Sequence, residues 1–107
     1  MVVMTKRKKI EILVDAPLLK RVRDLVSSAG VFGYTLYPTV GGEGESGRWQ
    51  DDQVTGGAGS KILFVTIIEI EDTERLLSIL TPLLEEYGLM ITVSNVDVLF
   101  VQAKGEK

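Results

Sequence analysis

The sequence predicts an α+β domain in which one strand-helix-strand unit occurs twice. The tripeptide Ile-Glu-Ile at residues 10–12 returns at residues 68–70. Each copy precedes an apolar pattern of helical period, and each pattern ends at a glycine, Gly30 or Gly88. A segment rich in β-branched and aromatic residues follows each predicted helix. A duplicated β-α-β unit therefore accounts for nearly the whole chain.

The first unit begins with a strand at residues 10–14, whose β-branched side chains suit a half-buried pleat. Asp15 is the expected N-cap of the helix that follows, and Pro17 fits its first turn, where a missing N–H costs nothing. The apolar positions occur at offsets of 0, 1, 4, 7, 8 and 11, which trace one helix face. They are Leu18, Leu19, Val22, Leu25, Val26 and Ala29.

The second unit repeats this arrangement. Asp72 or Thr73 is the expected cap, and the apolar offsets are identical, at Leu76, Leu77, Leu80, Leu83, Leu84 and Tyr87. Further strands are expected at residues 32–40, 61–70 and 89–101. The order β-α-β-β-α-β is typical of the ferredoxin-like fold, with two helices on one face of a four-stranded antiparallel sheet. Residues 1–107 are expected to form one domain.

Composition and charge exclude several classes of function. The formal net charge of −3 weighs against nucleic-acid binding, which normally needs a basic surface. The absence of cysteine excludes disulfides and thiolate metal sites, and the absence of histidine removes the commonest general base and metal ligand. No apolar run reaches transmembrane length, and residues 1–5 are too short for a signal segment. A cytoplasmic protein without direct membrane insertion is expected.

The strands at residues 61–70 and 89–101 carry apolar side chains on both faces, although the two helices can cover only one. A strand that is apolar on both sides is expected to be buried on both sides. A homo-oligomer that packs its sheets together would bury the second face, and closed symmetry is the usual arrangement.

The connection at residues 41–60 holds seven of the eleven glycines, and a loop of this length inside a small domain is usually functional or disordered. Backbone N–H groups in glycine-rich turns can bind anions, which makes Gly41, Gly42 and Gly44 candidates. Arg48 is the only basic residue in the loop, and Lys61 is the first residue after the loop. Both are candidate ligands of a phosphate or carboxylate.

The same loop carries candidate partner-binding residues. Trp49 is the only tryptophan, and tryptophan and arginine are common at interface hot spots. Glu45, Asp51 and Asp52 make the loop negative, so the partner surface is expected to be basic. Two alternatives remain: Trp49 folds back on its own subunit, or the loop is a solvated insertion without a task.

Four segments together resemble the PII-like signalling proteins of the nitrogen regulatory PII superfamily. They are Phe-Gly-Tyr-Thr at residues 32–35, Gly-Gly-Glu-Gly at 41–44, Gly-Arg-Trp at 47–49 and Asp-Val-Leu-Phe-Val at 97–101. The resemblance is strongest to the branch linked with carboxysomes and bicarbonate uptake. It implies a homotrimer that binds adenine nucleotide in clefts between subunits and contacts a target protein through the long loop, called the T-loop. The target would be an enzyme or a membrane transporter.

The resemblance also implies roles for single residues. Gly33 and Thr35 would lie at the nucleotide cleft, and Gly41, Gly42 and Gly44 would form the phosphate-proximal base of the loop. Arg48 would reach the phosphates or a co-bound anion such as bicarbonate, and Lys104 would be a basic phosphate ligand. Classical members grip the ATP phosphates with a longer loop between the second helix and the last strand. Here only residues 87–89 connect them, so ADP or AMP is expected rather than ATP.

Other functions stay open at the level of sequence. The loop could be a constitutive binding arm without a ligand. Acylphosphatase-like chemistry would need Arg48 beside an asparagine, and Asn95 is the only asparagine. The pair Asp51 and Asp52 could hold a hard cation weakly, although an exposed acidic pair is usually only solvated. The expected function is that of a regulator, not an enzyme, without a covalent cofactor or a metal.

Overall fold

A computed structural model describes residues 1–31, 33–44, 47–50 and 60–102 of the chain. Its elements, in order, are β1 (Val2–Asp15), α1 (Leu19–Ser28), β2 (Thr35–Pro38), β3 (Gly41–Gly44), β4 (Gly47–Gln50), β5 (Lys61–Ile68), α2 (Thr73–Tyr87) and β6 (Met90–Val101). A 3-10 turn precedes each helix, at Ala16–Leu18 and at Ile70–Asp72.

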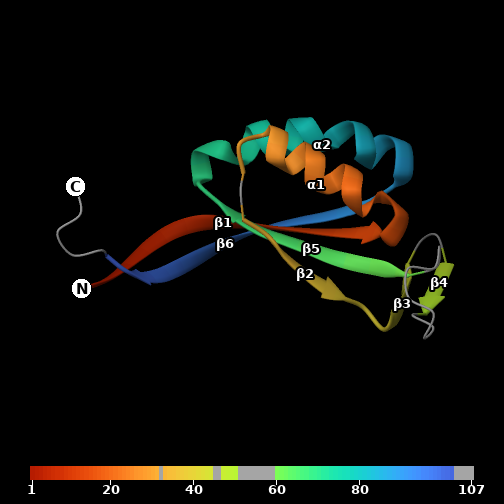
Figure 1. Ribbon diagram of the computed structural model, residues 1–107, viewed down its shortest axis with the longest axis horizontal. Helices are drawn as coiled ribbons and strands as arrows, with labels where there is room; N and C mark the ends of the chain where they lie inside the picture. Colours follow the sequence, from red (N-terminus) through yellow and green to blue (C-terminus); the bar gives the residue numbers. More distant parts are fainter. Residues whose placement is uncertain (32, 45–46, 51–59, 103–107) are drawn as a thin grey trace.

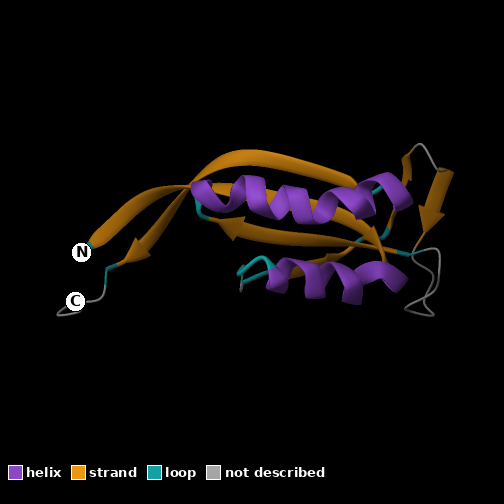
Figure 2. Ribbon diagram, turned by 90° about the horizontal axis from the view of Figure 1, so that it is seen from above, coloured by secondary structure: helices purple, strands orange, loops and turns teal. Residues whose placement is uncertain are grey.

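The strands β2, β5, β1 and β6 form an antiparallel sheet in that order, and both helices lie over one of its faces (Figures 1 and 2). This arrangement confirms the expected ferredoxin-like fold. The two strands β3 and β4 pair only with each other and form a separate ribbon beside the end of β5.

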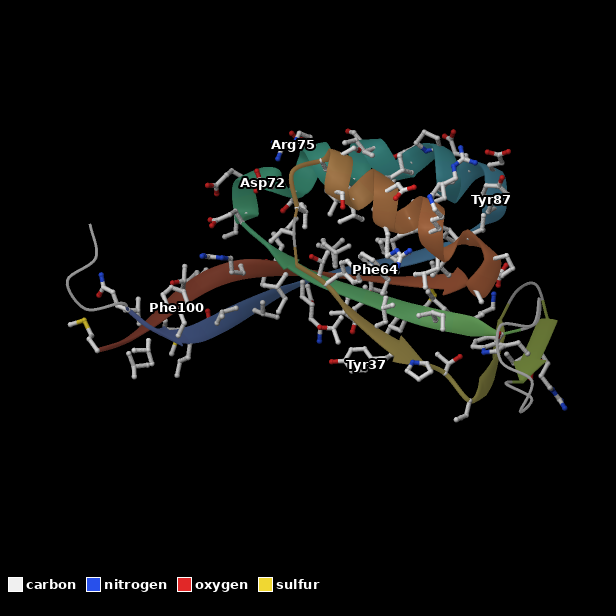
Figure 3. The ribbon with its side chains drawn as sticks, in the orientation of Figure 1. Tyr37, Phe64, Asp72, Arg75, Tyr87 and Phe100 are labelled. Atoms are coloured by element: carbon white, nitrogen blue, oxygen red, sulfur yellow. The ribbon has the colours of Figure 1, made fainter. Side chains whose placement is uncertain are left out.

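Most of the two predicted helical stripes lies in the core, but Leu84 and Tyr87 at the end of the second stripe are exposed. Ile10, Ile12 and Val14 of β1 are fully buried beneath the helices, as is Phe64 of β5 (Figure 3). The helix positions Val22, Val26, Leu76, Leu80 and Leu83 complete the same cluster. Burial of side chains of this size contributes roughly 1.5–3 kcal/mol each, so the core holds the sheet and both helices together.

Expectations about both helix caps and about one strand are wrong. Asp15 and Asp72 precede their helical segments, but neither side chain makes a capping hydrogen bond. The strand expected at residues 32–40 is shorter, because β2 covers only Thr35–Pro38. The segment before β2 is instead held by Thr66, whose hydroxyl donates a hydrogen bond to the carbonyl of Gly33. The ring of Tyr34 also stacks on Phe64, with 4.8 Å between the ring centroids.

The strand β1 is longer than the predicted strand at residues 10–14, whereas β6 agrees with the predicted strand at residues 89–101. They pair from Val2–Val101 to Leu13–Met90, whereas β5 ends opposite Lys8. Beyond that point β1 and β6 continue as a two-stranded ribbon that projects past the helices (Figure 1). Its outer part exposes apolar side chains, among them Val2, Met4, Leu99 and Val101.

The sheet face opposite the helices is also apolar. Leu13, Leu63, Val65 and Ile67 point to this face, and no described helix covers it. Ile67 is 48% exposed in the isolated chain. Tyr37 of β2 lies on the same side, away from the helices (Figure 3). The sequence predicted apolar side chains on both faces of the strands, and the sheet face opposite the helices is indeed apolar. None of the described helices is long and apolar enough to cross a membrane.

Candidate functional site

The base of the long connection has regular structure. The sequence predicted a loop from residue 41 onward, but β3 and β4 pair as an antiparallel hairpin in which Gly42 faces Trp49 and Glu43 faces Arg48. A Cβ added at Gly42 would lie 2.4 Å from the Trp49 ring. Cβ atoms in proteins do not come so close to a neighbouring atom. A side chain at position 42 would therefore collide with the indole ring of Trp49, and glycine is needed there.

Trp49 is anchored to its own subunit through Thr39. The indole Nε1 donates to the Thr39 hydroxyl at 3.1 Å, and that hydroxyl donates to the carbonyl of Lys61 at 2.8 Å. The backbone N–H of Thr39 donates to the same carbonyl. Trp49 is therefore linked through Thr39 to Lys61, the first residue of β5. This agrees with the alternative that Trp49 folds back on its own subunit. Its expected role in binding a partner stays a prediction.

Lys61 lies between an acidic and an aromatic side chain. Its ammonium is 2.6 Å from a carboxylate oxygen of Asp15 and 5.2 Å from the centroid of the Trp49 ring. The pair Asp15–Lys61 is the last register position between β1 and β5, and both side chains point to the face opposite the helices. Only 20% of the Lys61 side chain is exposed, against 44% for Asp15. This half-buried ion pair is a stronger interaction than a pair in open solvent.

A cavity of about 400 Å³ opens beside Lys61. Its walls combine the ring of Trp49 and the ammonium of Lys61 with apolar side chains and glycine backbone. The remaining lining residues are Leu13, Gly44, Gly88, Leu89 and Met90. Such a cavity suits a ligand with a flat apolar part and an anionic end, because a few polar groups in an apolar wall fix orientation.

The turn after α2 supplies one wall of this cavity. Gly88 ends the helix with φ 66°, and its N–H donates to the carbonyl of Leu84. Glycine adopts this left-handed conformation without the steric cost that a side chain would bring. The turn carries no basic side chain, so Lys61 is the only cation among the described residues that line the cavity.

Arg48 lies in a different hollow. It lines a separate, shallow hollow of about 430 Å³ with Val40, Glu43 and the glycines of β3. Trp49 borders both hollows. Of the predicted site residues, Gly44 and Lys61 thus line the first cavity. Gly41, Gly42 and Arg48 line the second hollow. The structure does not place Arg48 and Lys61 in one site.

Gly33 and Thr35 lie toward the other end of β5. Thr35 pairs with Val65, four residues from Lys61, which corresponds to about 13 Å along the strand. Gly33 lines a small cavity of about 170 Å³ together with Arg7 and Glu69. The structure thus separates these two expected nucleotide ligands from the Lys61 cavity within one subunit. Lys104, Glu45, Asp51 and Asp52 lie outside the described residues.

Sequence reasoning missed Asp15 and Thr39. Asp15 was assigned to a helix cap, which is the usual role of an aspartate between a strand and a helix. Its contact with Lys61 follows from strand register, which the sequence pattern does not specify to the residue. Thr39 precedes the glycine run without any motif of its own. No signal in the sequence pointed to it.

Comparisons with known proteins agree on one family. The family model described as nitrogen regulatory protein P-II matches residues 7–103. The structure of CPII, a PII-like protein from Thiomonas intermedia K12 bound to ADP, AMP and bicarbonate, superposes with a TM-score of 0.81. Its sequence is 24% identical, over 90% of this chain and 91% of that one.

Two further structures are similar over most of their length. The apo form of CPII gives a TM-score of 0.76 at 23% identity, covering 94% of this chain and 100% of that chain. A PII-like signalling protein from Thermus thermophilus gives a TM-score of 0.70 at 28% identity, covering 89% of this chain and 91% of that chain. No curated protein matches the chain.

Proposed function

Because the chain belongs to the nitrogen regulatory protein P-II family, we propose that it is a cytoplasmic signalling protein that binds ADP or AMP. It assembles as a homotrimer with the nucleotide between subunits, and its T-loop engages a target protein. An inorganic-carbon transporter is the candidate target. The observation that carries the proposal is the cavity at Lys61, at the base of the loop and beside the turn after α2.

The cavity has the chemistry of a nucleotide site. Lys61 supplies a positive charge for a phosphate, and Gly44 and Gly88 leave room for phosphate oxygens beside the backbone. Leu13, Leu89 and Met90 supply an apolar surface. CPII, which has the same fold, is described as bound to ADP and AMP, which supports adenine nucleotide as the ligand class.

The turn after α2 favours fewer phosphates. A triphosphate carries more negative charge than a monophosphate or diphosphate, and tight binding needs several cations or a metal ion. In the part of the chain that the structure describes, Lys61 is the only cation that lines the cavity, and it already pairs with Asp15. ADP and AMP are therefore preferred over ATP.

The separation of Gly33 and Thr35 from Lys61 supports a site between subunits. One subunit places the two groups about 13 Å apart along β5. A neighbouring subunit would bring its own Gly33 and Thr35 to the Lys61 cavity. Packing of sheet faces in such an assembly would also cover the exposed apolar surface around Ile67 and Met90.

Bicarbonate is the candidate second ligand. Its support is the CPII structure with bound bicarbonate, together with an exposed arginine in a hollow at the base of the loop. We assign Arg48 to this anion, because its hollow is separate from the cavity at Lys61. Arg48→Ala is then expected to remove any effect of bicarbonate on ADP affinity.

The acylphosphatase-like alternative gains no support. Asn95 pairs with Lys8, and its side-chain oxygen accepts a hydrogen bond from that lysine at 2.6 Å. Lys8 faces Ile68, at the end of β5 opposite to Lys61 and the hairpin. Arg48 and Asn95 are thus at different ends of the sheet and cannot share one substrate within a subunit.

Calorimetric titration of the intact protein with AMP, ADP and ATP tests the proposal. Micromolar binding of ADP or AMP, weaker binding of ATP, and a loss of more than tenfold in ADP affinity on Lys61→Met are expected. The control is Lys20→Met, which removes an exposed lysine on α1 that pairs only with Asp24. Equal ADP affinity in wild type and Lys61→Met would remove this cavity from the nucleotide site.

A further inference from the structure

Asp15 stands where an aspartate usually caps a helix, but it has another contact. It directly precedes the first 3-10 turn, with φ −62° and ψ 138°, and its side chain makes no capping hydrogen bond. The backbone beside it is fixed from outside the turn, because the N–H of Ala16 donates to the carbonyl of Ser60 at 3.0 Å. The Asp15 carboxylate is therefore used for a contact away from the helix.

That contact is with the ammonium of Lys61, at 2.6 Å. Asp15 and Lys61 are directly opposite on neighbouring strands, so their side chains share one sheet face. Leu13, two residues earlier on β1, points to the same face and lines the Lys61 cavity. Asp15 is not one of the described residues that line the cavity. Its charge therefore acts on a ligand there from behind the ammonium that the ligand would contact.

The carboxylate offsets the positive charge of the cavity. Among the described residues that line it, Lys61 is the only cation and none is acidic. Only 20% of the Lys61 side chain is exposed, so water screens its charge less than it would in open solvent. An anion at the ammonium is attracted by Lys61 and repelled by Asp15. Both effects grow with the charge of the anion, so with Asp15 in place an added phosphate gains little.

An added phosphate also has a cost, because it gives up hydrating water when it enters the cavity. We propose that Asp15 sets the nucleotide selectivity of the Lys61 cavity: its carboxylate offsets the lysine charge, so the cavity accepts AMP and ADP and disfavours ATP. This inference rests on the proposed function, because it takes an adenine nucleotide as the ligand. It assigns the selectivity to a residue that acts against the wrong ligand by a like charge.

Asp15→Asn separates the charge of this residue from its position. The amide oxygen of asparagine still accepts a hydrogen bond from Lys61, whereas the negative charge is gone. The measurement is calorimetric titration of the intact protein with AMP, ADP and ATP. Affinity is expected to rise about threefold for AMP and about thirtyfold for ATP, with ADP between them, because the loss of repulsion scales with ligand charge. The ratio of ATP affinity to AMP affinity then rises about tenfold.

A role limited to positioning Lys61 gives a different pattern. If Asp15 only held the ammonium in place, its replacement would weaken the binding of all three nucleotides by a similar factor. Asp15→Glu adds a second check, because it keeps the charge and moves the carboxylate by one methylene group. It is expected to leave the ATP-to-AMP ratio within about threefold of wild type. Groups that a neighbouring subunit contributes are the same in every variant and do not alter the comparison.

Glu11→Gln is the matched control. Glu11 lies on the same strand and the same sheet face as Asp15, but its carboxylate pairs with Lys9 at 3.5 Å. Four residues separate the two positions, which corresponds to about 13 Å along the strand. The control changes the net charge of the protein by the same amount as Asp15→Asn. Because its charge is remote from the cavity, it is expected to change the ATP-to-AMP ratio by less than about twofold.

Salt gives a readout that a change in packing would not move. The difference in the ATP-to-AMP ratio between wild type and Asp15→Asn should shrink when sodium chloride is raised from about 0.05 M to about 0.5 M, because salt screens the charge. The Asp15 side chain is 44% exposed and lies outside the core, so its replacement is expected to leave the protein folded. Circular dichroism checks this, and Asp15→Ser, which is also uncharged, repeats the test.

Inorganic phosphate, pyrophosphate and triphosphate, titrated in parallel, form the same charge series without adenosine. Nucleotides that bind with an unchanged ATP-to-AMP ratio in Asp15→Asn, or with a uniform loss, overturn the role of Asp15 and leave the nucleotide site standing. A gain that rises along the inorganic series in Asp15→Asn, while no nucleotide binds, keeps the selection by charge and overturns the nucleotide proposal. Silence from every probe in wild type and variants overturns both.

Discussion

At the scale of single residues, Gly42 shows how a packing requirement can look like a ligand-binding motif. Its place in a glycine run suggested an anion nest, but the structure puts the Trp49 ring where a side chain would be. The ring is then available to Thr39 and Lys61. The glycine is needed by the tryptophan, whatever the ligand is.

Gly42→Ala is expected to displace the Trp49 ring, because the new Cβ would lie 2.4 Å from ring atoms. Acrylamide quenching of the ligand-free protein should rise, while the melting temperature changes by less than about 2 °C, since the hairpin lies outside the core. The matched control is Gly44→Ala, whose Cβ meets nothing within 4 Å. Equal quenching in both variants would contradict the packing role of Gly42.

At the scale of elements, much of the fold could be predicted from sequence. The first helix stripe, the first part of the second stripe and alternate residues of the strand at 10–14 are buried as their periodicity indicated, whereas Leu84 and Tyr87 at the end of the second stripe are exposed. Periodicity depends on local geometry, so it reports which face is buried without knowledge of the partner element. The same reasoning located the loop and its glycines.

The remaining features depend on pairing between distant segments. The extension of β1 to Val2 requires β6 as a partner, and the contact of Asp15 with Lys61 requires the register of β1 against β5. The β3–β4 hairpin was missed because its strands consist largely of glycine and polar residues, which have low strand propensity. Its pairing is supported by one indole ring, which no pattern of hydrophobicity reveals.

The contact between the two helices gives a prediction at this scale. The Arg75 guanidinium donates two hydrogen bonds to the carbonyl of Ala29, at 3.1 and 2.7 Å, and thereby ties α2 to the end of α1 (Figure 3). Arg75→Met keeps much of the aliphatic stem and removes these bonds, together with the ion pair between Arg75 and Asp72 at the start of α2. It is expected to lower the free energy of unfolding by about 1 kcal/mol, because the group is half-exposed.

Urea denaturation measures this loss. Arg21→Met serves as control, since Arg21 is exposed on α1 and its side chain makes no hydrogen bond or ion pair with another described residue. Its effect should stay within about 0.5 kcal/mol. A loss at Arg75 no larger than that at Arg21 would show that the bridge between the helices does not contribute to stability.

At the scale of the whole molecule, the chain leaves one sheet face and one ribbon without cover. The helices protect a single face, while Ile67 and Met90 are exposed on the other. Val2 and Val101 are exposed on the projecting ribbon. A small domain gains stability when such surfaces are buried between subunits. The expected homotrimer follows from this surface together with the family.

Ile67→Lys is expected to shift the protein from trimer to monomer, because it places a charge on the uncovered apolar face. Analytical ultracentrifugation measures the mass. The control is Leu84→Lys, which places the same charge at a partly exposed apolar position on α2 and should leave the trimer intact. A trimer that persists in Ile67→Lys would show that the subunits associate through another surface.

The most direct test of the account is the affinity of the intact protein for ADP, measured by calorimetry with and without bicarbonate. We expect micromolar affinity, one nucleotide per subunit, and a change in affinity when bicarbonate is present. No detectable binding of ADP in either condition would contradict it. The T-loop would then act as a binding arm that does not depend on a nucleotide.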